Sequence, residues 1–348
     1  MGLRILHSAD WHLGSPFRGF DRERQRLLKE AQRKIPDLVA DLCRRENCDL
    51  VLLAGDLFDA APSKDWVELL KAALADCAVP VFLAPGNHDF CAPGSPWLEE
   101  VWPENVHIFT GGLESVALKE LDCRIYGAGY TSMDCEALLE GFRAECEERY
   151  QIGLLHGDPV QLHSPYCPVT AAQVRDSGLS YLALGHIHKS GAFRAGQTLC
   201  GWPGCPMGRG YDETGEMGLY LVELETDVTI RKLLLCTPRF YEITVNTDAQ
   251  SPEDVLPGVG SDDFYRLTLT GSGEVDEGVF ARFPNLVLRD YREEQQDLWC
   301  TAEEDTLEGT YFRILWEALE DADEKDAARI RQAAAISRKI LEGREVEL

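Results

Sequence analysis

Short runs of apolar residues alternate with longer amphipathic stretches from the start of the chain to about residue 238. The apolar runs have the length of buried strands, and they cover residues 3–7, 50–54, 80–84, 106–109, 124–126, 152–155, 181–184 and 219–224. Between the early runs, residues 22–44 and 65–76 have the apolar spacing of helices. Strands that alternate with helices predict an α/β fold with helices on both faces of the sheet structure.

The alternation changes near residue 239. Residues 240–290 predict a small α+β unit with strands at 241–245, 264–269 and 286–289 and helical turns near 252–256 and 276–283. After residue 291 the chain is acidic and has helical spacing, with apolar faces around Phe312 and Ile330. We therefore predict three parts: a large α/β domain over 1–238, a small α+β domain over 239–292 and a helical C-terminal segment over 293–348. The last helices are expected to pack on each other or on the main body, and docking onto a partner's helix is the alternative.

The composition is that of a globular protein rather than of a fibre or a disordered chain. Of the 348 residues, 45% are hydrophobic and 27% are charged. No apolar run approaches the roughly 18 residues of a membrane span, and the first residues lack the layout of a secretory signal. We expect a cytoplasmic protein with no membrane partner, in which the 12 cysteines are reduced thiols because no CxxC pair is present.

The formal net charge of −26 limits which partners bulk electrostatics can attract. Such a chain repels polyanions at long range, so a phosphate-bearing substrate has to be held by metal ions or by a local basic patch. Residues 18–34 form the one such patch, with seven basic and three acidic side chains. Its candidate DNA contacts are Arg18, Arg22, Arg24 and Arg26, and the equally weighted alternative is the solvated face of a helix.

Five short polar motifs each follow a predicted strand. They are Asp10-Trp11-His12, Gly55-Asp56-Leu57-Phe58-Asp59, Gly86-Asn87-His88-Asp89, His156-Gly157-Asp158 and Gly185-His186-Ile187-His188. Taken alone, each motif is most often a turn or a helix cap. In open α/β sheets, however, ligands bind outside the carboxyl ends of the strands, so five motifs at five such ends predict one common site.

The residue types of these motifs indicate a metal centre that hydrolyses phosphate esters. Imidazole, carboxylate and amide donors suit Mn²⁺, Fe²⁺ or Zn²⁺ better than Mg²⁺ alone. Two ions about 3.5–4 Å apart need a shared ligand, for which Asp56 is the natural candidate, and a hydroxide that bridges them can attack phosphorus. His88 stands beside a ligand and is placed to protonate the leaving oxygen, with Asp59 or Asp89 orienting its ring.

The motif set resembles the calcineurin-like metallophosphoesterase superfamily over the first two thirds of the chain. The residues from His7 to Gly14 and from Gly55 to Asp59 resemble the motifs of SbcD-type DNA repair exonucleases, one branch of that superfamily. The segment from Gly201 to Arg209, which leads to Glu213 and Gly218, resembles the same branch. Protein serine/threonine phosphatases carry Asp-Arg-Gly where this chain has Asp59-Ala60-Ala61, so that branch is disfavoured. The resemblance implies a two-sheet sandwich flanked by helices, followed by a small α+β capping domain and a helical tail.

The resemblance also implies roles for individual residues. One metal ion would take Asp10, His12, Asp56 and His188, and the other would take Asp56, Asn87, His156 and His186, with His88 as the catalytic histidine. Members of that branch use Mn²⁺ and cleave DNA phosphodiesters, often as 3′→5′ exonucleases with some single-strand endonuclease activity. Their helical tail docks on an SbcC-type ATPase, and they commonly form homodimers through the catalytic domain.

We therefore expect a metal-dependent phosphodiesterase with two divalent ions, most simply Mn²⁺, that acts as an SbcD-like DNA exonuclease in DNA repair. One alternative is a phosphodiesterase or phosphatase that acts on a small nucleotide or a phosphoprotein. Another is a partner module that regulates an SbcC-like ATPase. Cleavage polarity, the physiological metal, the oligomeric state and the binding of an ATPase stay open at this point.

Overall fold

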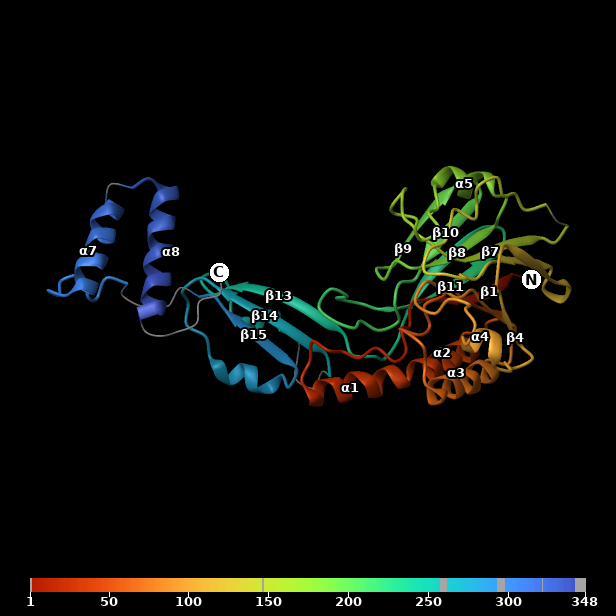
Figure 1. Ribbon diagram of the computed structural model, residues 1–348, viewed down its shortest axis with the longest axis horizontal. Coiled ribbons are helices and arrows are strands. Elements are labelled where there is room, and N and C mark those ends of the chain that lie inside the picture. The colour runs from red at the N-terminus through yellow and green to blue at the C-terminus, as the bar shows by residue number, and fades with distance from the viewer. Residues whose placement is uncertain (1, 146, 257–261, 293–297, 321, 342–348) are drawn as a thin grey trace. The chain divides into compact units, whose positions relative to one another are not determined.

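The computed structural model describes residues 2–145, 147–256, 262–292, 298–320 and 322–341. They form two compact units, which are coloured from red to green and from green to blue in Figure 1. The first unit holds residues 1–242 together with the short segments Gly260–Arg266 and Pro284–Val287, and the second holds the rest. Within the described ranges, no helix has the length and apolarity needed to cross a bilayer.

The first unit is built on two six-stranded sheets. The first sheet has the order β12-β11-β1-β2-β3-β4, with β12 at Val228–Leu234, β11 at Gly218–Leu224, β1 at Leu3–Ser8, β2 at Leu50–Leu53, β3 at Val81–Leu83 and β4 at Val106–Ile108. The second has the order β5-β6-β7-β8-β10-β9, with β5 at Glu114–Leu118, β6 at Cys123–Gly127, β7 at Tyr150–His156, β8 at Tyr181–Gly185, β10 at Thr198–Trp202 and β9 at Gly191–Ala195. This layout confirms the predicted α/β sandwich of two sheets.

Alternation of side chains along the strands explains the layers. In β2, Leu50 and Leu52 point into a core that also contains Ile125 and Ile152 of the second sheet. Val51 and Leu53 point the other way, into a core shared with helices on the outer face of the first sheet. Because β2 is buried on both faces, its sequence is a continuous apolar run rather than an alternating one.

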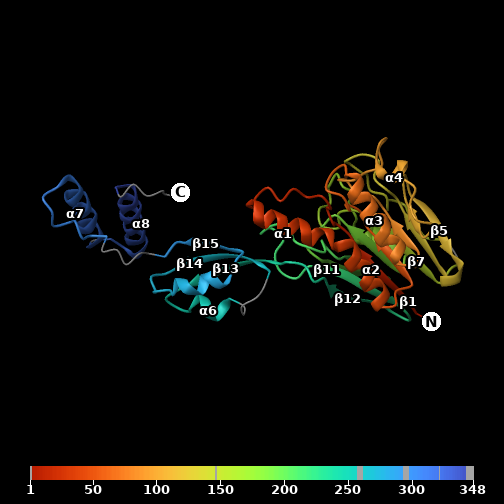
Figure 2. The same cartoon turned by 90° about the horizontal axis from the view of Figure 1, so that it is seen from below.

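Helices α1 (Arg22–Arg33), α2 (Ile35–Arg45) and α3 (Lys64–Asp76) belong to the outer side of the first sheet, and α4 (Pro96–Glu99) is a short turn (Figure 2). The second sheet carries α5 (Ala171–Asp176) on its own outer side. The prediction of one helix over residues 22–44 was wrong. The chain breaks at Lys34 because Pro36 lies in the first turn of α2, where its missing N–H is tolerated, whereas in a helix interior it would break the hydrogen-bond ladder.

The C-terminal third has the elements that the sequence predicts. Strands β13 (Phe240–Asn246), β14 (Phe264–Thr270) and β15 (Leu286–Asp290) form a three-stranded sheet, accompanied by α6 (Pro252–Val255) and a 3₁₀ helix at Glu277–Arg282. Helices α7 (Leu307–Glu320) and α8 (Glu324–Leu341) then pack as a hairpin. Arg338 of α8 lies over the ring of Phe312 and pairs with Glu308, both of α7, so the helices pack on each other as expected.

The parallel strands determine where the site forms. In the first sheet β1, β2 and β3 are parallel neighbours, and in the second β6, β7 and β8 are parallel neighbours. The five polar motifs follow β1, β2, β3, β7 and β8. Each of these motifs therefore begins at the carboxyl end of a strand.

Candidate metal centre

The structure brings all five motifs together. The loops after β1 and β2 run side by side, because the N–H groups of Asp10 and His12 donate to the carbonyls of Gly55 and Asp56 at 3.0 Å each. The two sheets are joined at the same place, where the N–H of His186 donates to Asp10 Oδ1 at 2.9 Å. Residues that are 176 positions apart in the sequence thus meet in one site.

The backbone is strained at this site. Four residues here have φ angles in the left-handed region, which residues other than glycine rarely adopt. The angles are 55° at Asp10, 45° at His12, 51° at Asp56 and 85° at His186. Each such residue costs about 1–3 kcal/mol and persists only where the surrounding structure imposes it. Four of the seven predicted metal ligands are held in this way, which is typical of a functional site rather than of ordinary turns.

A first group of donor atoms consists of Asp10, His12 and His188, whose side chains offer oxygen or nitrogen atoms within 4.8 Å of one another. Nε2 of His12 lies 3.2 Å from Nε2 of His188. Each ring turns its Nδ1 to a carboxylate, since His12 Nδ1 is 3.3 Å from Asp59 Oδ1 and His188 Nδ1 is 2.7 Å from Glu213 Oε1. When both rings are neutral and carry hydrogen on Nδ1, the two Nε2 lone pairs face each other, and a cation between them would remove the repulsion.

Asp10 supports the same conclusion. Its Oδ1 accepts from the His186 N–H, but its Oδ2 is buried and has no hydrogen-bond partner among the described residues. Burial raises the pKa of this carboxyl, while the nearby imidazoles of His156 and His188 act in the opposite direction. An unpartnered buried carboxylate oxygen is costly unless it binds a cation or a proton, so Asp10 fits the predicted role of metal ligand.

A second group of donor atoms surrounds His156, the last residue of β7. His156 Nδ1 donates to the main-chain carbonyl of Ala54 at 2.8 Å, which leaves the Nε2 lone pair free. That Nε2 lies 3.0 Å from Asn87 Oδ1 and 3.4 Å from Asp56 Oδ2, both of which are acceptors. Asn87 Oδ1 is also 3.3 Å from Nδ1 of His186. When His156 carries hydrogen only on Nδ1, its Nε2 is a third acceptor beside these two oxygens, and a bound cation would satisfy all three in place of a proton.

Asp56 belongs to both groups, because its Oδ2 lies 3.8 Å from His12 Nε2 as well as 3.4 Å from His156 Nε2. Burial alone would raise its pKa, but the His156 and His12 imidazoles and the His88 N–H hold it well below the usual range. Asp56 in turn raises the pKa of His156 to about 9, against the effect of burial. The donor set therefore fits two divalent cations with Asp56 shared between them.

Glycines allow the loops to come this close. A Cβ on Gly86 would collide with Asp56 Oδ1, and a Cβ on Gly185 would collide with the carbonyl of Ala54. Both glycines directly precede predicted ligands, Asn87 and His186. The glycine in each of these motifs is therefore required by the approach of a neighbouring loop rather than by a turn alone.

His88 lies at the open side of the centre. Its ring faces that of His12 at a centroid distance of 4.8 Å, and its side chain is exposed, whereas those of His12 and His156 are buried. The main-chain N–H of His88 donates to Asp56 Oδ1 at 2.9 Å, so the position of His88 depends on the shared carboxylate. An exposed imidazole beside a phosphate-binding centre can reach a leaving oxygen, which fits the predicted catalytic role.

The expected orientation of His88 by a carboxyl group needs correction. Its Nδ1 lies 3.1 Å from the main-chain carbonyl of Asp59, not from a carboxylate. The Asp59 carboxylate faces His12 and, at 3.3 Å, Arg209. Asp89 is occupied as well, because its carboxylate accepts from the N–H groups of Gly86, Leu57 and Phe58 and so ties the loop after β2 to the loop after β3.

Sequence reasoning did not assign a role to Arg209 and Glu213. Glu213 is buried, contacts Nδ1 of His188 and pairs with Arg209 at 2.6 Å. Arg209 also pairs with Asp59, so one guanidinium connects the two carboxylates that contact His12 and His188. Both residues lie in the segment after the last metal motif that carries the resemblance, which was the available signal.

The four arginines proposed as DNA contacts lie on or next to α1. Arg18, Arg22 and Arg26 are exposed, and Arg26 pairs with Glu30 at 2.7 Å. The Arg24 guanidinium is used within the protein, where it donates to the main-chain carbonyls of Pro284 and Leu286 at 3.2 Å each. The aromatic residues that precede this segment do not face solvent, because Trp11 and Phe17 are part of the core and are only 2% and 5% exposed.

Comparisons with known proteins point to one family. Residues 3–190 match the family described as calcineurin-like phosphoesterase. The uncharacterized metallophosphoesterase YhaO of Bacillus subtilis (strain 168) is 31% identical over 368 residues, which cover 93% of this chain and 88% of that protein. A solved dimetal phosphatase from Danio rerio is 14% identical over 66% of this chain and 96% of its own, with a TM-score of 0.43. The solved protein TT1561 of Thermus thermophilus is 12% identical over 67% of this chain and 99% of its own, with a TM-score of 0.41.

The family match spans more than half of the chain and includes all five motifs. The relative from Bacillus subtilis extends the likeness over nearly the whole length, beyond the end of the family match. Two groups of histidine, carboxylate and amide donors lie where the five motifs meet. The chain belongs to the calcineurin-like phosphoesterase family.

Proposed function

We propose that this protein is a metal-dependent phosphodiesterase that cleaves DNA, as an SbcD-like exonuclease with two Mn²⁺ ions. The observation that carries the proposal is the shared position of Asp56 between two groups of donors, with His88 exposed beside them. Two ions bound there would lower the pKa of a water nucleophile and neutralise charge on the phosphate.

The protein's own side chains account for the remaining requirements of the reaction. The Ala54 carbonyl and the Glu213 carboxylate fix His156 and His188 with their Nε2 atoms toward the centre. His88 is free to donate a proton to the oxygen that leaves phosphorus, which contributes typically about 10²–10⁴-fold to such a rate. The Asp59 carbonyl accepts a hydrogen bond from Nδ1 of His88, which holds the ring in place.

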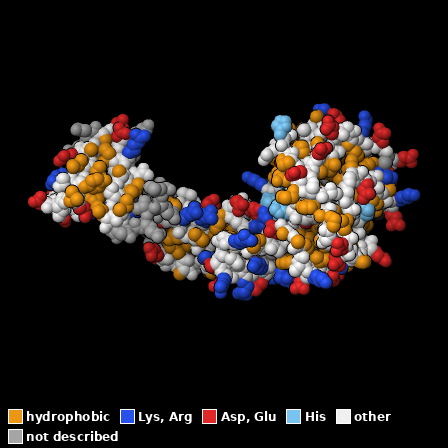
Figure 3. Space-filling model, viewed as in Figure 1, with side chains coloured by type: hydrophobic (Ala, Val, Ile, Leu, Met, Phe, Trp, Pro, Cys, Tyr) orange, Lys and Arg blue, Asp and Glu red, His pale blue; other side chains and the backbone are white. Residues whose placement is uncertain are grey.

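The DNA part of the proposal is supported by the charge distribution around α1. In a chain of net charge −26, the exposed Arg18, Arg22, Arg26 and Lys29 form a local basic patch, visible as blue side chains near α1 in Figure 3. The patch begins six residues after His12, so it starts near the metal centre along the chain. Each phosphate held by such a patch contributes about −0.9 to the slope of log affinity against log salt.

The test is hydrolysis by the full-length chain with added Mn²⁺, using bis-p-nitrophenyl phosphate and end-labelled single- and double-stranded DNA. We expect stepwise shortening of DNA from one end and loss of both activities on chelation. Cleavage of the small diester with intact DNA would retain the two-metal chemistry and refute the DNA substrate. A matched pair, Arg22→Ala against Arg313→Ala of α7, tests the patch, because only the former should reduce the salt slope.

A second candidate role, regulation of an SbcC-type ATPase, is favoured by one observation on the helical hairpin. Leu307 and Ile314 of α7 and Ile340 of α8 are 90%, 58% and 62% exposed, so the hairpin keeps apolar side chains on its surface (Figure 3). Exposed apolar helix faces are common binding surfaces for partner helices. Co-purification of the full chain with such an ATPase, and its loss in Ile314→Glu but not in Glu317→Gln, would test this role.

A further inference from the structure

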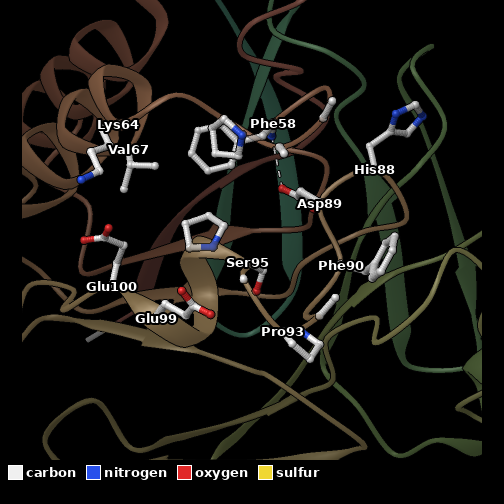
Figure 4. A pocket seen from close by; sticks show the side chains of 16 residues that line it. Phe58, Lys64, Val67, His88, Asp89, Phe90, Pro93, Ser95, Glu99 and Glu100 are labelled. Carbon is white, nitrogen blue, oxygen red and sulfur yellow. Dashed lines mark hydrogen bonds between the residues drawn. The ribbon is translucent and has the colours of Figure 1, made fainter.

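A cavity of about 370 Å³ opens beside the metal centre, between the loop that follows β2 and the loop that follows β3 (Figure 4). Much of its wall is apolar and flat, with the rings of Phe90 and Pro93 at the surface, whereas Phe58, which also borders the cavity, is fully buried. The volume lies in the range of about 300–1,000 Å³ in which proteins bind small organic groups. No residue of the two metal-binding groups lines it.

His88 connects this cavity to the reaction centre. It lines the cavity, and its ring nitrogen also lies within 4.8 Å of donor atoms of His12 and Asp56. A phosphate held at the centre with its leaving oxygen near His88 therefore has its leaving group at the mouth of the cavity. The cavity is positioned for the organic part of the leaving group rather than for a second phosphate.

The polar lining of the cavity is mostly acidic or neutral, with Lys64 and His88 as its basic side chains. Glu99 and Glu100 contribute carboxylates. Glu100 accepts from Lys71 at 3.1 Å, whereas the exposed Glu99 carboxylate has no partner among the described residues. The hydroxyl oxygen of Ser95 is buried and has no hydrogen-bond partner among the described residues. These groups disfavour an anion and favour a neutral ligand that donates hydrogen bonds. Lys64 lies at the end of the cavity away from His88 (Figure 4).

We propose that this cavity is a nucleoside subsite on the leaving-group side of the centre, with a preference for bases that carry an exocyclic amino group. The flat apolar wall suits a base, since aromatic and apolar side chains stack on every base. The Glu99 carboxylate would accept from the amino group of adenine or cytosine, and the Ser95 hydroxyl would pair with a ring or sugar atom. Thymine has no exocyclic amino group and offers Glu99 a single donor, its N3–H, where an amino group offers two.

The inference rests on the proposed function, because it assumes that a phosphate occupies the neighbouring centre. A binding experiment without any phosphate separates the two. The Mn²⁺-loaded full-length chain is titrated with deoxyadenosine and with thymidine, and binding is measured by calorimetry. Deoxyadenosine should bind about fivefold more tightly than thymidine, the difference that one net hydrogen bond gives. Glu99→Gln, which replaces a charged acceptor with a weaker neutral one, should reduce that preference, whereas Glu104→Gln, at an exposed glutamate outside the cavity, should keep it.

Kinetics provide the second measurement. For oligodeoxyadenylate, Glu99→Gln should raise KM about fivefold, and Ser95→Ala should act in the same direction. Glu104→Gln, outside the cavity, should keep the wild-type KM for oligodeoxyadenylate and the wild-type rate with bis-p-nitrophenyl phosphate. Ala61→Trp, which fills the mouth of the cavity, should weaken both nucleosides.

The outcomes distinguish the two claims. Equal binding of both nucleosides by wild type, or an unchanged preference in Glu99→Gln, would overturn the subsite while the hydrolysis of the small diester could still stand. If no phosphodiester is cleaved but deoxyadenosine binds in a Glu99-dependent manner, the proposed function fails and the cavity remains a nucleoside site.

Discussion

Glu213 Oε1 lies 2.7 Å from Nδ1 of His188, and this contact directs the other ring nitrogen, Nε2, toward the metal centre. The pairing raises the pKa of His188 in spite of its burial, and it lowers the pKa of Glu213 well below the usual range. A carboxylate that holds a metal-binding histidine sets both its tautomer and its basicity. Loss of this pair should therefore weaken metal binding directly and slow the reaction only as a consequence.

We expect Glu213→Gln to weaken Mn²⁺ binding about 10–100-fold, the usual cost of losing such a partner. The measurement is Mn²⁺ titration of the full-length chain by calorimetry. Glu216→Gln, an exposed glutamate three residues along the chain, is the matched control and should bind Mn²⁺ as wild type does. Unchanged affinity in Glu213→Gln would show that His188 does not depend on this carboxylate.

His88 is expected to affect turnover rather than metal binding. His88→Ala should reduce kcat about 10²–10⁴-fold with bis-p-nitrophenyl phosphate, the usual contribution of a proton donor, and leave two Mn²⁺ per chain by elemental analysis. His163→Ala, which removes another exposed histidine, serves as the control. Loss of one metal in His88→Ala would mean that His88 is a ligand, in line with its donor atom near His12 and Asp56.

The sequence was sufficient to predict the strand ends that meet at the centre. Each motif directly follows an apolar run, so the residues and their strands are neighbours in the chain, and parallel strands place such ends together. Asp10 and His186 are an example, since the main-chain N–H of His186 donates to the Asp10 carboxylate although 176 positions separate the two residues. The local apolar pattern and the general geometry of parallel sheets are therefore enough to predict that the five motifs meet.

The groups that hold the ligands could not be predicted in the same way. Arg209 and Glu213 lie on a loop with no apolar pattern, and their contacts to Asp59 and His188 depend on how that loop folds back. The orientation of His88 by the Asp59 carbonyl was missed because a main-chain acceptor leaves no signature in residue types. Edge strands β5, β9 and β12 were also missed, since their half-exposed positions lack a continuous apolar run.

Metal binding should stabilise the fold. The buried carboxylates of Asp10 and Asp56 lie in one site, and Asp56 is among the causes that raise the pKa of Asp10. Cations that bind only the folded chain add about 2.7 kcal/mol at a hundredfold excess over Kd. Thermal unfolding with and without Mn²⁺ should therefore show a rise in Tm of several degrees, and Asp56→Asn should lose most of it. An equal rise in Asp56→Asn would place the stabilising ions elsewhere.

His7 should make the fold sensitive to acid independently of the metal centre. The ring is fully buried, with Nε2 donating to the carbonyl of Leu184 at 3.1 Å and Nδ1 accepting from the hydroxyl of Tyr181 at 2.8 Å. Both nitrogens are thus used by the neutral ring. Burial lowers the pKa of His7 to about 3, and the hydrogen bond to Leu184 offsets only part of that effect.

Because the folded-state pKa of His7 lies below its unfolded value of about 6.5, the unfolded chain binds the extra proton as the pH falls. The contribution of His7 to stability is complete above pH 6.5 and declines below it, by about 2 kcal/mol between pH 7.5 and pH 5. Urea unfolding of wild type and His7→Gln at these two pH values tests this. His7→Gln should lose about 2 kcal/mol less than wild type over that range. His107→Gln, whose histidine side chain is 40% exposed, should follow wild type, and identical pH dependence in all three would show that His7 protonates in the folded chain.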